Sequence, residues 1–410
     1  MPSSANRFVA LLSLLNLVNY VDRYVLASVL PRVKADLALT DADCGWLQTA
    51  FLIGYLLASP MFSVLARSVP RRTIIGWGMG VLGVATVASG YATNFWSLLA
   101  LRAVVGVGEA SYAALAPTFI DELVKPASRG KALASFYVMA PVGAAIGFIV
   151  GSQVERHLGW RTSFYFTGIP AIALAISALT LPETGRPETT SRSTFDDFST
   201  LLREPVYRLN ALAYTAFTFT IGGFSYWVPT YVSRQFGLSL AKASSTFGGI
   251  LVVGGLLGSV VGGILYDRFQ KASKAPRPDL SVGLAICGFS TLAATPLVAI
   301  MFMIENAGAF FALALPALVL LFTSNAPVNA VILRAAPPGL RLQSMGVTIS
   351  VIHLFGDLWS PPLVGIISDV TGSLRAGCLI FPGALLLAAI LWCQALRLGP
   401  RLNAESGPLK

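Results

Sequence analysis

The chain has 410 residues, of which 55% are hydrophobic and only 12% are charged, and its mean hydropathy is +0.71. These values exclude a soluble globular protein, because so few charged residues cannot cover the surface of a globule of this size. The net charge of +10 could suggest a nucleic-acid partner. The basic residues, however, are concentrated in every second loop between the hydrophobic runs. We therefore expect an all-α, polytopic membrane protein.

Hydrophobic runs of about 20 residues, separated by turn-forming or charged clusters, predict the membrane-spanning helices. Twelve are expected, at residues 8–31, 42–66, 73–92, 95–120, 129–152, 161–181, 207–233, 241–265, 280–304, 307–333, 343–367 and 374–397. Twenty Lys and Arg residues then fall on the side of both termini and seven on the opposite side. By the positive-inside rule both termini are cytoplasmic, so the basic excess reflects topology and no nucleic-acid partner is expected.

The first expected helix contains the string NYVDRY, which places Asp22 and Arg23 inside an apolar run. Adjacent residues of a helix point about 100° apart, so these two side chains cannot face the same partner. If the helix rises from the cytoplasm and ends at Pro31, Asp22 lies nine residues, about 13 Å, below the outer surface.

The stretch LRAVVGVGEASYAALAP, residues 101–117, places Arg102 and Glu109 inside another apolar run. A charge near the centre of a membrane helix costs roughly 2.5–3.5 kcal/mol, so such groups usually have a functional role or are paired with another charge. The seven-residue gap turns a helix by about 700°, which places both side chains on one face. Arg102 lies about 10 Å below the outer surface, close to the depth of Asp22. We infer an Asp22–Arg102 ion pair, which leaves Glu109 alone near the midplane and Arg23 facing another partner.

Two loops carry related sequence signatures. The loop SVLARSVPRRT, residues 63–73, is similar to the G-x-L-x-D-R-x-G-R-R signature of the major facilitator superfamily, with Ser63, Arg67 and Pro70 where Gly, Asp and Gly are usual. The string GGILYDR, residues 262–268, repeats the signature with its acid in place. The resemblance implies two six-helix halves with a substrate site between them near the midplane.

The expected domains are an N-terminal half at residues 1–181, a cytoplasmic linker at 182–206 and a C-terminal half at 207–410. The linker is polar and bears prolines, and a short amphipathic helix is possible at 195–203. The four scattered cysteines and only two histidines predict no disulfide, no metal site and no cofactor.

The second half is poorer in membrane-embedded charge. Asp357 is its clear intramembrane acid, and His353 precedes it by one helical turn, a spacing that allows a local hydrogen bond or a secondary proton site. Pro361 and Pro362 follow and must kink the helix or free carbonyl groups that line a cavity.

Four blocks along the chain resemble the Spinster family of major facilitator transporters. They are NLVNYVDRYVLASVLP at 16–31, GVGEASYAALAPTFIDEL at 106–123, FYVMAPVGAAIGFIVGS at 136–152 and GDLWSPPLVGIISD at 356–369. The resemblance implies transport of amphiphilic lipids, such as sphingosine-1-phosphate or lysophospholipids, across or between leaflets by alternating access, with proton coupling. It maps the functional acid and arginine pairs onto Asp22, Arg23, Arg102 and Glu109. The short termini suggest a bacterial inner-membrane member that acts on a lysophospholipid.

The expected substrate pocket has a polar part and an apolar continuation, as an amphiphile requires. Substrate-binding candidates are Asn19, Arg23, Arg102, Glu109, Tyr112, Tyr226 and Trp227. An arginine keeps its proton and can act as a phosphate ligand or counter-ion. A carboxylate can switch, because its proton affinity depends on burial and on nearby charge. The proton-coupling candidates are therefore Asp22, Glu109 and their neighbour Arg102.

Other functional classes fit the sequence less well. An enzyme is not expected, because the chain lacks G-x-S-x-G, H-E-x-x-H and paired acids at metal-binding spacing. A transport-dead receptor would be expected to have lost the buried charges. The main alternative is a proton-coupled symporter of a small organic anion. As partners we expect the substrate, protons and membrane lipids, with the protein acting as a monomer.

Overall fold

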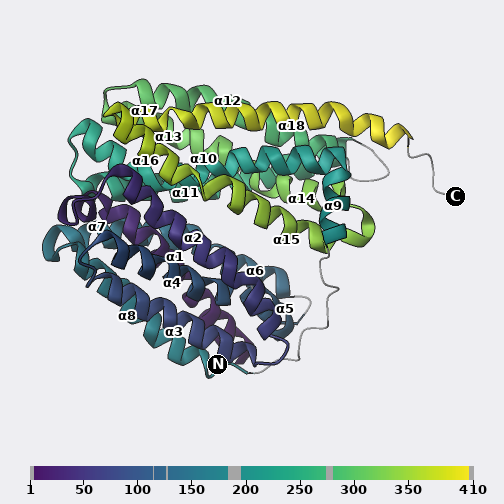
Figure 1. Ribbon diagram of the computed structural model, residues 1–410. Coiled ribbons are helices and arrows are strands. Elements are labelled where there is room, and N and C mark those ends of the chain that lie inside the picture. The colour runs from purple at the N-terminus through teal and green to yellow at the C-terminus, as the bar shows by residue number, and fades with distance from the viewer. Residues whose placement is uncertain (1–3, 114, 126–127, 183–194, 274–279, 406–410) are drawn as a thin grey trace. The chain divides into compact units, whose positions relative to one another are not determined.

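The computed structural model (Figure 1) describes residues 4–113, 115–125, 128–182, 195–273 and 280–405. This part of the chain is helical and contains no β-strand. The helices of the first half are α1 (Ser4–Asp36), α2 (Asp41–Leu65), α3 (Arg71–Ser89), α4 (Phe95–Ala113), α5 (Ala116–Leu123), α6 (Arg129–Tyr137), α7 (Met139–Leu158) and α8 (Trp160–Ala178).

Residues 183–194 of the expected linker lie outside the described residues, and the remaining helices begin after them. They are α9 (Phe195–Arg203), α10 (Pro205–Phe236), α11 (Leu240–Ala272), α12 (Leu280–Met303), α13 (Ala307–Phe322), α14 (Asn325–Ala335), α15 (Arg341–Ile352), the π-helical turn η3 (His353–Asp357), α16 (Ser360–Thr371), α17 (Leu374–Cys378) and α18 (Ile380–Glu405). The short 3₁₀ turn η2 (Pro338–Leu340) precedes α15. Helix α9 confirms the amphipathic helix expected at residues 195–203.

All twelve expected membrane segments are helical. Ten helical runs within the described residues are long and apolar enough to cross a membrane, as judged by length and composition. The two further expected segments correspond to α8, a helix of 19 residues, and to nearly the whole of α10, a helix of 32 residues. The prediction of an all-α membrane protein is therefore confirmed.

Five of the expected continuous helices are interrupted, which corrects the sequence prediction. The interruptions separate α4 from α5, α6 from α7, α13 from α14, α15 with η3 from α16, and α17 from α18. The helical segment before each break, which is η3 in the fourth case, ends four or five residues before a proline; these prolines are Pro117, Pro141, Pro327, Pro361 and Pro382. A proline has no N–H to donate to the carbonyl four residues earlier, and its ring crowds that carbonyl. The prolines therefore account for the breaks.

The chain forms two compact units, which we describe separately. Unit 1 comprises residues 1–190, 226–252 and 361–370, and unit 2 comprises 191–225, 253–360 and 371–410. Unit 1 thus combines the first half with the end of α10, the start of α11 and most of α16. The domain boundaries expected from the sequence stay a prediction.

Within unit 1, α1 packs against α7 and α8, α2 against α4, and α3 against α4 and α8 (Figure 1). The backbones of α2 and α4 are in direct contact, because glycines of each helix lie against backbone carbonyl groups of the other. A Cβ atom built on Gly106 would lie 1.9 Å from the carbonyl oxygen of Phe51, and one on Gly54 would lie 2.0 Å from that of Ala103. Small residues give membrane helices this close approach. The same contact fixes the position of Arg102, one residue before Ala103.

We expect Gly106→Ala to lower the melting temperature of the purified protein by several degrees, because the added methyl group forces α2 and α4 apart. Overpacking of this kind costs about 1–3 kcal/mol. The matched control is Gly346→Ala in α15, where a Cβ meets nothing within 4 Å. Alanine is the better helix former, so the control should leave the melting temperature unchanged or raise it. Equal melting temperatures for the two variants would contradict the close contact.

Candidate functional site

Asp22 of α1 and Arg102 of α4 form a buried polar pair in unit 1. Their side chains are 1% and 0% exposed, and Arg102 Nη1 lies 4.0 Å from Asp22 Oδ2. The pairing predicted from the matching depths of the two residues is therefore confirmed. Thr167 of α8 donates a hydrogen bond to Asp22 Oδ1 at 3.4 Å, a contact that was not predicted. The Asp22 carboxylate is held by two helices.

The guanidinium of Arg102 is unusual because it is buried without a full set of hydrogen-bond acceptors. Its Nε, Nη1 and Nη2 atoms have no hydrogen-bond partner among the described residues, since 4.0 Å to Asp22 is too long for one. The Phe51 ring lies against the guanidinium, with 5.1 Å between Cζ and the ring centroid. An unsatisfied buried charge is costly. The site is therefore suited to an anion that brings its own acceptor oxygens.

Arg23 and Glu109 form a second pair beside the first. Arg23 Nη1 donates to Glu109 Oε1 at 3.3 Å, and the two side chains are 21% and 4% exposed. This finding corrects the expectation that Glu109 stands alone. Arg23 also lies over the ring of Phe51, at 5.2 Å from Cζ to centroid. Phe51 therefore contacts both arginines, and sequence analysis missed it because nothing in the sequence distinguishes it from the other phenylalanines of the membrane segments.

Arg102 and Glu109 both reach residues of α1, which confirms that they lie on one face of α4. The two pairs alternate in sign, so each helix contributes one cation and one anion. Exchange of a proton or an anion at one pair alters the electrostatic field at the other, because Coulomb interactions are strong where water is scarce.

Two further candidates of the first half are buried close to this site. Tyr112 is 1% exposed and its hydroxyl donates to the carbonyl oxygen of Leu12. Asn19 is 2% exposed, and its Oδ1 atom has no hydrogen-bond partner among the described residues. Tyr112 thus ties α4 to α1, whereas Asn19 retains an acceptor for a ligand. Their roles in substrate binding stay predictions.

Tyr226 and Trp227 of α10 use their polar atoms within unit 1. The Tyr226 hydroxyl donates to the carbonyl oxygen of Cys44 at 2.6 Å, and Trp227 Nε1 donates to that of Pro361 at 2.9 Å. Both side chains are buried. Their hydrogen-bonding atoms are therefore already engaged within the protein. The predicted binding role again stays a prediction.

His353 and Asp357 form a local pair in unit 2. His353 Nδ1 lies 3.0 Å from both carboxylate oxygens of Asp357. The two residues bound the π-helical turn η3, a conformation often found at functional positions. Gly222 of α10 lies directly against Asp357, because a Cβ at Gly222 would be 2.4 Å from Asp357 Cβ. The structure gives the local hydrogen bond that the spacing allows, and the secondary proton role stays a prediction.

A further charged cluster surrounds Asp41 at the start of α2, and sequence analysis did not identify it. Arg234 forms a bidentate bond to the two Asp41 oxygens, at 2.8 Å each, and Ser368 donates to Asp41 at 2.7 Å. Lys34 also donates to Asp41. Asp369 accepts from the backbone N–H groups of Asp41 and Ala42, so it stabilises the positive end of α2. The cluster fastens the ends of α10 and α16 to α2.

We expect Arg234→Ala to lower the melting temperature, because it leaves the Asp41 carboxylate, which is 5% exposed, without its bidentate partner. Hydrogen bonds to charged groups contribute about 1.5–3 kcal/mol each. The control is Arg32→Ala, which removes an arginine that is 66% exposed in its pair with Glu155. Such surface pairs contribute little. Strict additivity of Arg234→Ala and Asp41→Ala in a double-mutant cycle would rule out the coupling.

Comparison with known proteins adds an independent line of evidence. A family model described as Major Facilitator Superfamily matches residues 12–356. The chain is 32% identical over 442 residues to spinster homolog 1 of Arabidopsis thaliana, described as a probable sphingolipid transporter. That match covers 94% of this chain and 87% of the relative. Human protein spinster homolog 1 is 30% identical, with 90% of this chain and 74% of the relative covered.

Solved structures share the fold. The crystal structure of a bacterial homolog to the human lysosomal transporter Spinster, in an inward-facing and unoccupied conformation, matches with a TM-score of 0.85. The match covers 98% of each chain at 20% sequence identity. The human organic anion transporter MFSD10 matches with a TM-score of 0.66 at 16% identity, over 96% of this chain and 100% of that chain. These likenesses establish the architecture.

Proposed function

The chain belongs to the Spinster family of the major facilitator superfamily, and from this premise we propose that it transports an amphiphilic lipid with an anionic headgroup. The family consists of multi-pass membrane transporters and not of enzymes. Within it, a lysophospholipid or a sphingosine-1-phosphate-like molecule is the substrate class we favour. The protein moves this substrate across or between leaflets by alternating access, as a monomer.

The observation that carries this proposal is the Arg102 guanidinium, which is 0% exposed and has no hydrogen-bond partner among the described residues. Guanidinium groups bind phosphate in a bidentate manner, with two parallel N–H···O bonds. A phosphate in this position receives the donors that the protein leaves unused. Arg23 lies on the same Phe51 ring and adds a second positive charge.

A lipid is favoured over a small anion by the apolar surroundings and by the relatives. Phe51, Tyr226 and Trp227 are almost completely buried and offer aromatic surface. The Arabidopsis relatives are described as probable sphingolipid transporters. A headgroup on Arg102 with a chain along apolar helix faces satisfies both ends of an amphiphile.

Proton coupling is proposed for the acids that pair with the two arginines, Asp22 and Glu109. Each carboxylate lies near a permanent positive charge, so its proton affinity changes when that distance or the access of water changes. When the substrate phosphate binds the arginine, the attraction between the arginine and the carboxylate becomes weaker, which favours protonation of the carboxylate. By thermodynamic reciprocity, protonation of the acid then favours binding of the substrate anion.

The proposed location is a bacterial inner membrane with both termini in the cytoplasm. The support is the asymmetry of basic residues, twenty on the side of the termini against seven on the other. Arg23 and Arg102 are excluded from both counts because they lie inside the expected apolar runs and not at their ends. A cysteine-accessibility assay with labels placed in the loops reports this topology directly.

The test of the proposed function is uptake of a labelled lysophospholipid into proteoliposomes, with and without an imposed proton gradient. We expect transport above that of protein-free liposomes, and stimulation of transport by the gradient. A labelled dicarboxylate in parallel vesicles tests the small-anion alternative. Dicarboxylate uptake without lysolipid movement, in protein shown to be monodisperse, would overturn the lipid assignment.

A further inference from the structure

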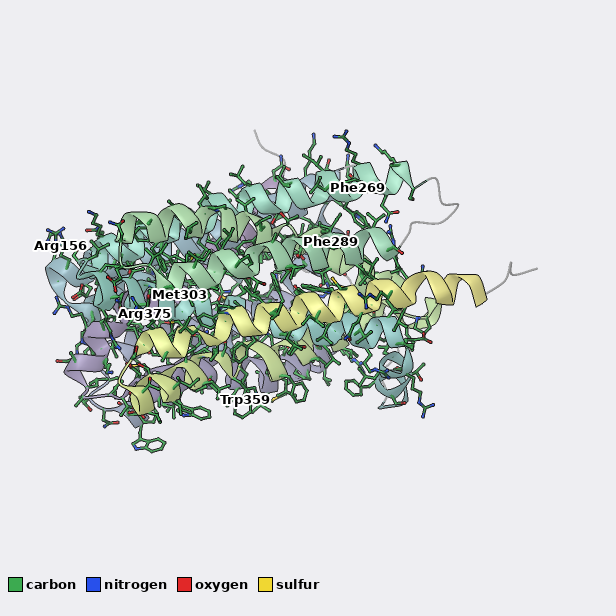
Figure 2. The ribbon with its side chains drawn as sticks, turned by 90° about the horizontal axis from the view of Figure 1, so that it is seen from above. Arg156, Phe269, Phe289, Met303, Trp359 and Arg375 are labelled. Atoms are coloured by element: carbon green, nitrogen blue, oxygen red, sulfur yellow. The ribbon has the colours of Figure 1, made fainter. Side chains whose placement is uncertain are left out.

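Unit 2 carries an apolar groove outside the candidate site, between α11 and α12. Its volume is about 740 Å³, within the range of ligand pockets of about 300–1,000 Å³. Leu265 and Phe269 of α11 line one wall and Ala285 and Phe289 of α12 line the other. Figure 2 shows Phe269 and Phe289 on neighbouring helices at the surface, and they are 49% and 58% exposed. The groove therefore opens toward the surroundings of the protein.

Glycines of α11 explain why the groove stays open. A Cβ atom on Gly258 would lie 2.4 Å from the Val319 carbonyl oxygen, and one on Gly262 would lie 2.1 Å from that of Thr323. These residues bring the backbones of α11 and α13 together and contribute no side chain to the space beside them.

The polar atoms that line the groove are already used within the protein. The hydroxyls of Ser273, Ser290 and Thr323 donate to the backbone carbonyls of Gln270, Cys287 and Val319. What these positions offer to an occupant is hydrocarbon and aromatic surface. The occupant that fits this lining is an alkyl chain, which needs no hydrogen bonds.

Positive charge adjoins the end of the groove at which α11 terminates. Arg268 comes three residues after Leu265 and four before Ala272, both of which line the groove, so it lies on the adjoining side of the helix. Lys271 follows one turn later, and both residues are exposed. The nearby Arg334 is engaged with the hydroxyl of Tyr266. Arg268 and Lys271 are thus placed to meet a phosphate at the rim.

The first half repeats this arrangement on a smaller scale in unit 1. A groove of about 280 Å³ is lined by Leu65 of α2 and Trp77 of α3. Leu65 and Leu265 hold the same position in the two loop signatures, at residues 63–73 and 262–268. Each groove thus adjoins a signature loop that carries basic residues. Because the arrangement occurs in both halves, we do not regard the groove of unit 2 as an incidental feature of the surface.

We propose that the groove between α11 and α12 binds an anionic diacyl phospholipid of the membrane, with one acyl chain along Leu265, Phe269 and Phe289 and the phosphate beside Arg268 and Lys271. This lipid is a bound component and not the transported substrate. The site lies at the end where the basic residues gather, so it takes lipid from the leaflet on that side.

Native mass spectrometry of the purified full-length protein, titrated with phosphatidylglycerol or with phosphatidylcholine, tests the proposal. We expect phosphatidylglycerol to bind more tightly. The double variant Arg268→Ala/Lys271→Ala should weaken its binding by roughly thirty-fold, because each cation near a membrane surface contributes about one factor of five. The control Lys125→Ala/Lys131→Ala removes two exposed lysines elsewhere and should leave the affinity unchanged.

A second variant tests the groove itself. Ala285→Trp fills it and should reduce the binding of both lipids, whereas Leu387→Trp, on an exposed position of α18 that does not line the groove, should not. Equal affinity for the two lipids, or unchanged binding after Ala285→Trp, would overturn the proposal. Because no transport is measured, failure here is separate from failure of the proposed lysolipid transport.

Discussion

Replacing Arg102 with alanine is expected to abolish lysolipid transport, with a loss of at least a hundredfold in initial rate. The side chain is 0% exposed and has no hydrogen-bond partner among the described residues, so its donors are available to a substrate phosphate. A bidentate charge-assisted interaction in a water-poor site is worth several kcal/mol, and every 1.4 kcal/mol corresponds to tenfold. Arg102→Lys keeps the charge without the planar fork and should recover only part of the activity.

A double variant separates binding of substrate from simple neutralisation of Asp22. If Arg102 served only to balance the Asp22 carboxylate, Asp22→Asn would relieve the unpaired charge in Arg102→Gln, and the double variant would transport again. If Arg102 binds the headgroup, the double variant stays inactive. Rates are normalised to monodisperse protein, and Arg156→Ala, at an exposed arginine, is the control. Recovery of transport in the double variant would therefore sink the headgroup role.

The positions of the membrane segments along the chain could be predicted from the sequence because apolar length is a local property of the chain. The interruptions were harder to place, since a proline is tolerated in membrane helices when neighbouring groups satisfy the freed carbonyl. Pro170 and Pro229 lie inside the continuous helices α8 and α10, whereas Pro117 lies in the first turn of the new helix α5. Tertiary surroundings decide between these outcomes.

The Asp22–Arg102 pair could be predicted because depth along a helix follows from residue number. The Arg23–Glu109 pair was missed, although both residues were identified as candidates. Glu109 lies about 10 Å deeper than Arg102 along α4, so depth alone separates it from Arg23. Side chains lean toward the N-terminus of their own helix. If α1 and α4 cross the membrane in opposite directions, the Arg23 side chain therefore leans toward the cytoplasmic side and the Glu109 side chain toward the outer side. This brings the two charged groups to a similar depth.

The Asp41 cluster depends on contacts that no local pattern encodes. Asp41 and Asp369 are separated by 328 residues, and each looks like an ordinary charged residue at a helix end. The one local signal is the capping box of Thr40 and Asp43, which marks the start of α2. That signal predicts where the helix begins but not that Asp369 caps it as well. Such a pairing arises from the tertiary fold and not from local sequence.

Replacing Glu109 with glutamine is expected to abolish stimulation of transport by a proton gradient while leaving exchange of substrate largely intact. Glutamine is isosteric with the protonated acid, so it keeps a hydrogen-bonding group beside Arg23 but cannot release a proton. Net uptake driven by the gradient requires that release, whereas exchange of labelled for unlabelled substrate does not. Coupling energies between sites usually correspond to about 5- to 150-fold, and a loss of stimulation in this range is expected.

The contrast with Asp22 decides which acid carries the proton. Asp22→Asn removes the carboxylate beside Arg102, so it should weaken both exchange and gradient-driven uptake if Asp22 mainly positions the arginine. Glu305→Gln, at an exposed acid between α12 and α13, is the control and should behave like the wild type. Gradient stimulation that survives in Glu109→Gln and disappears only in Asp22→Asn would transfer the coupling role to Asp22. Gradient stimulation that survives in the double variant Asp22→Asn/Glu109→Gln would exclude both carboxylates from coupling, because neither could then release a proton.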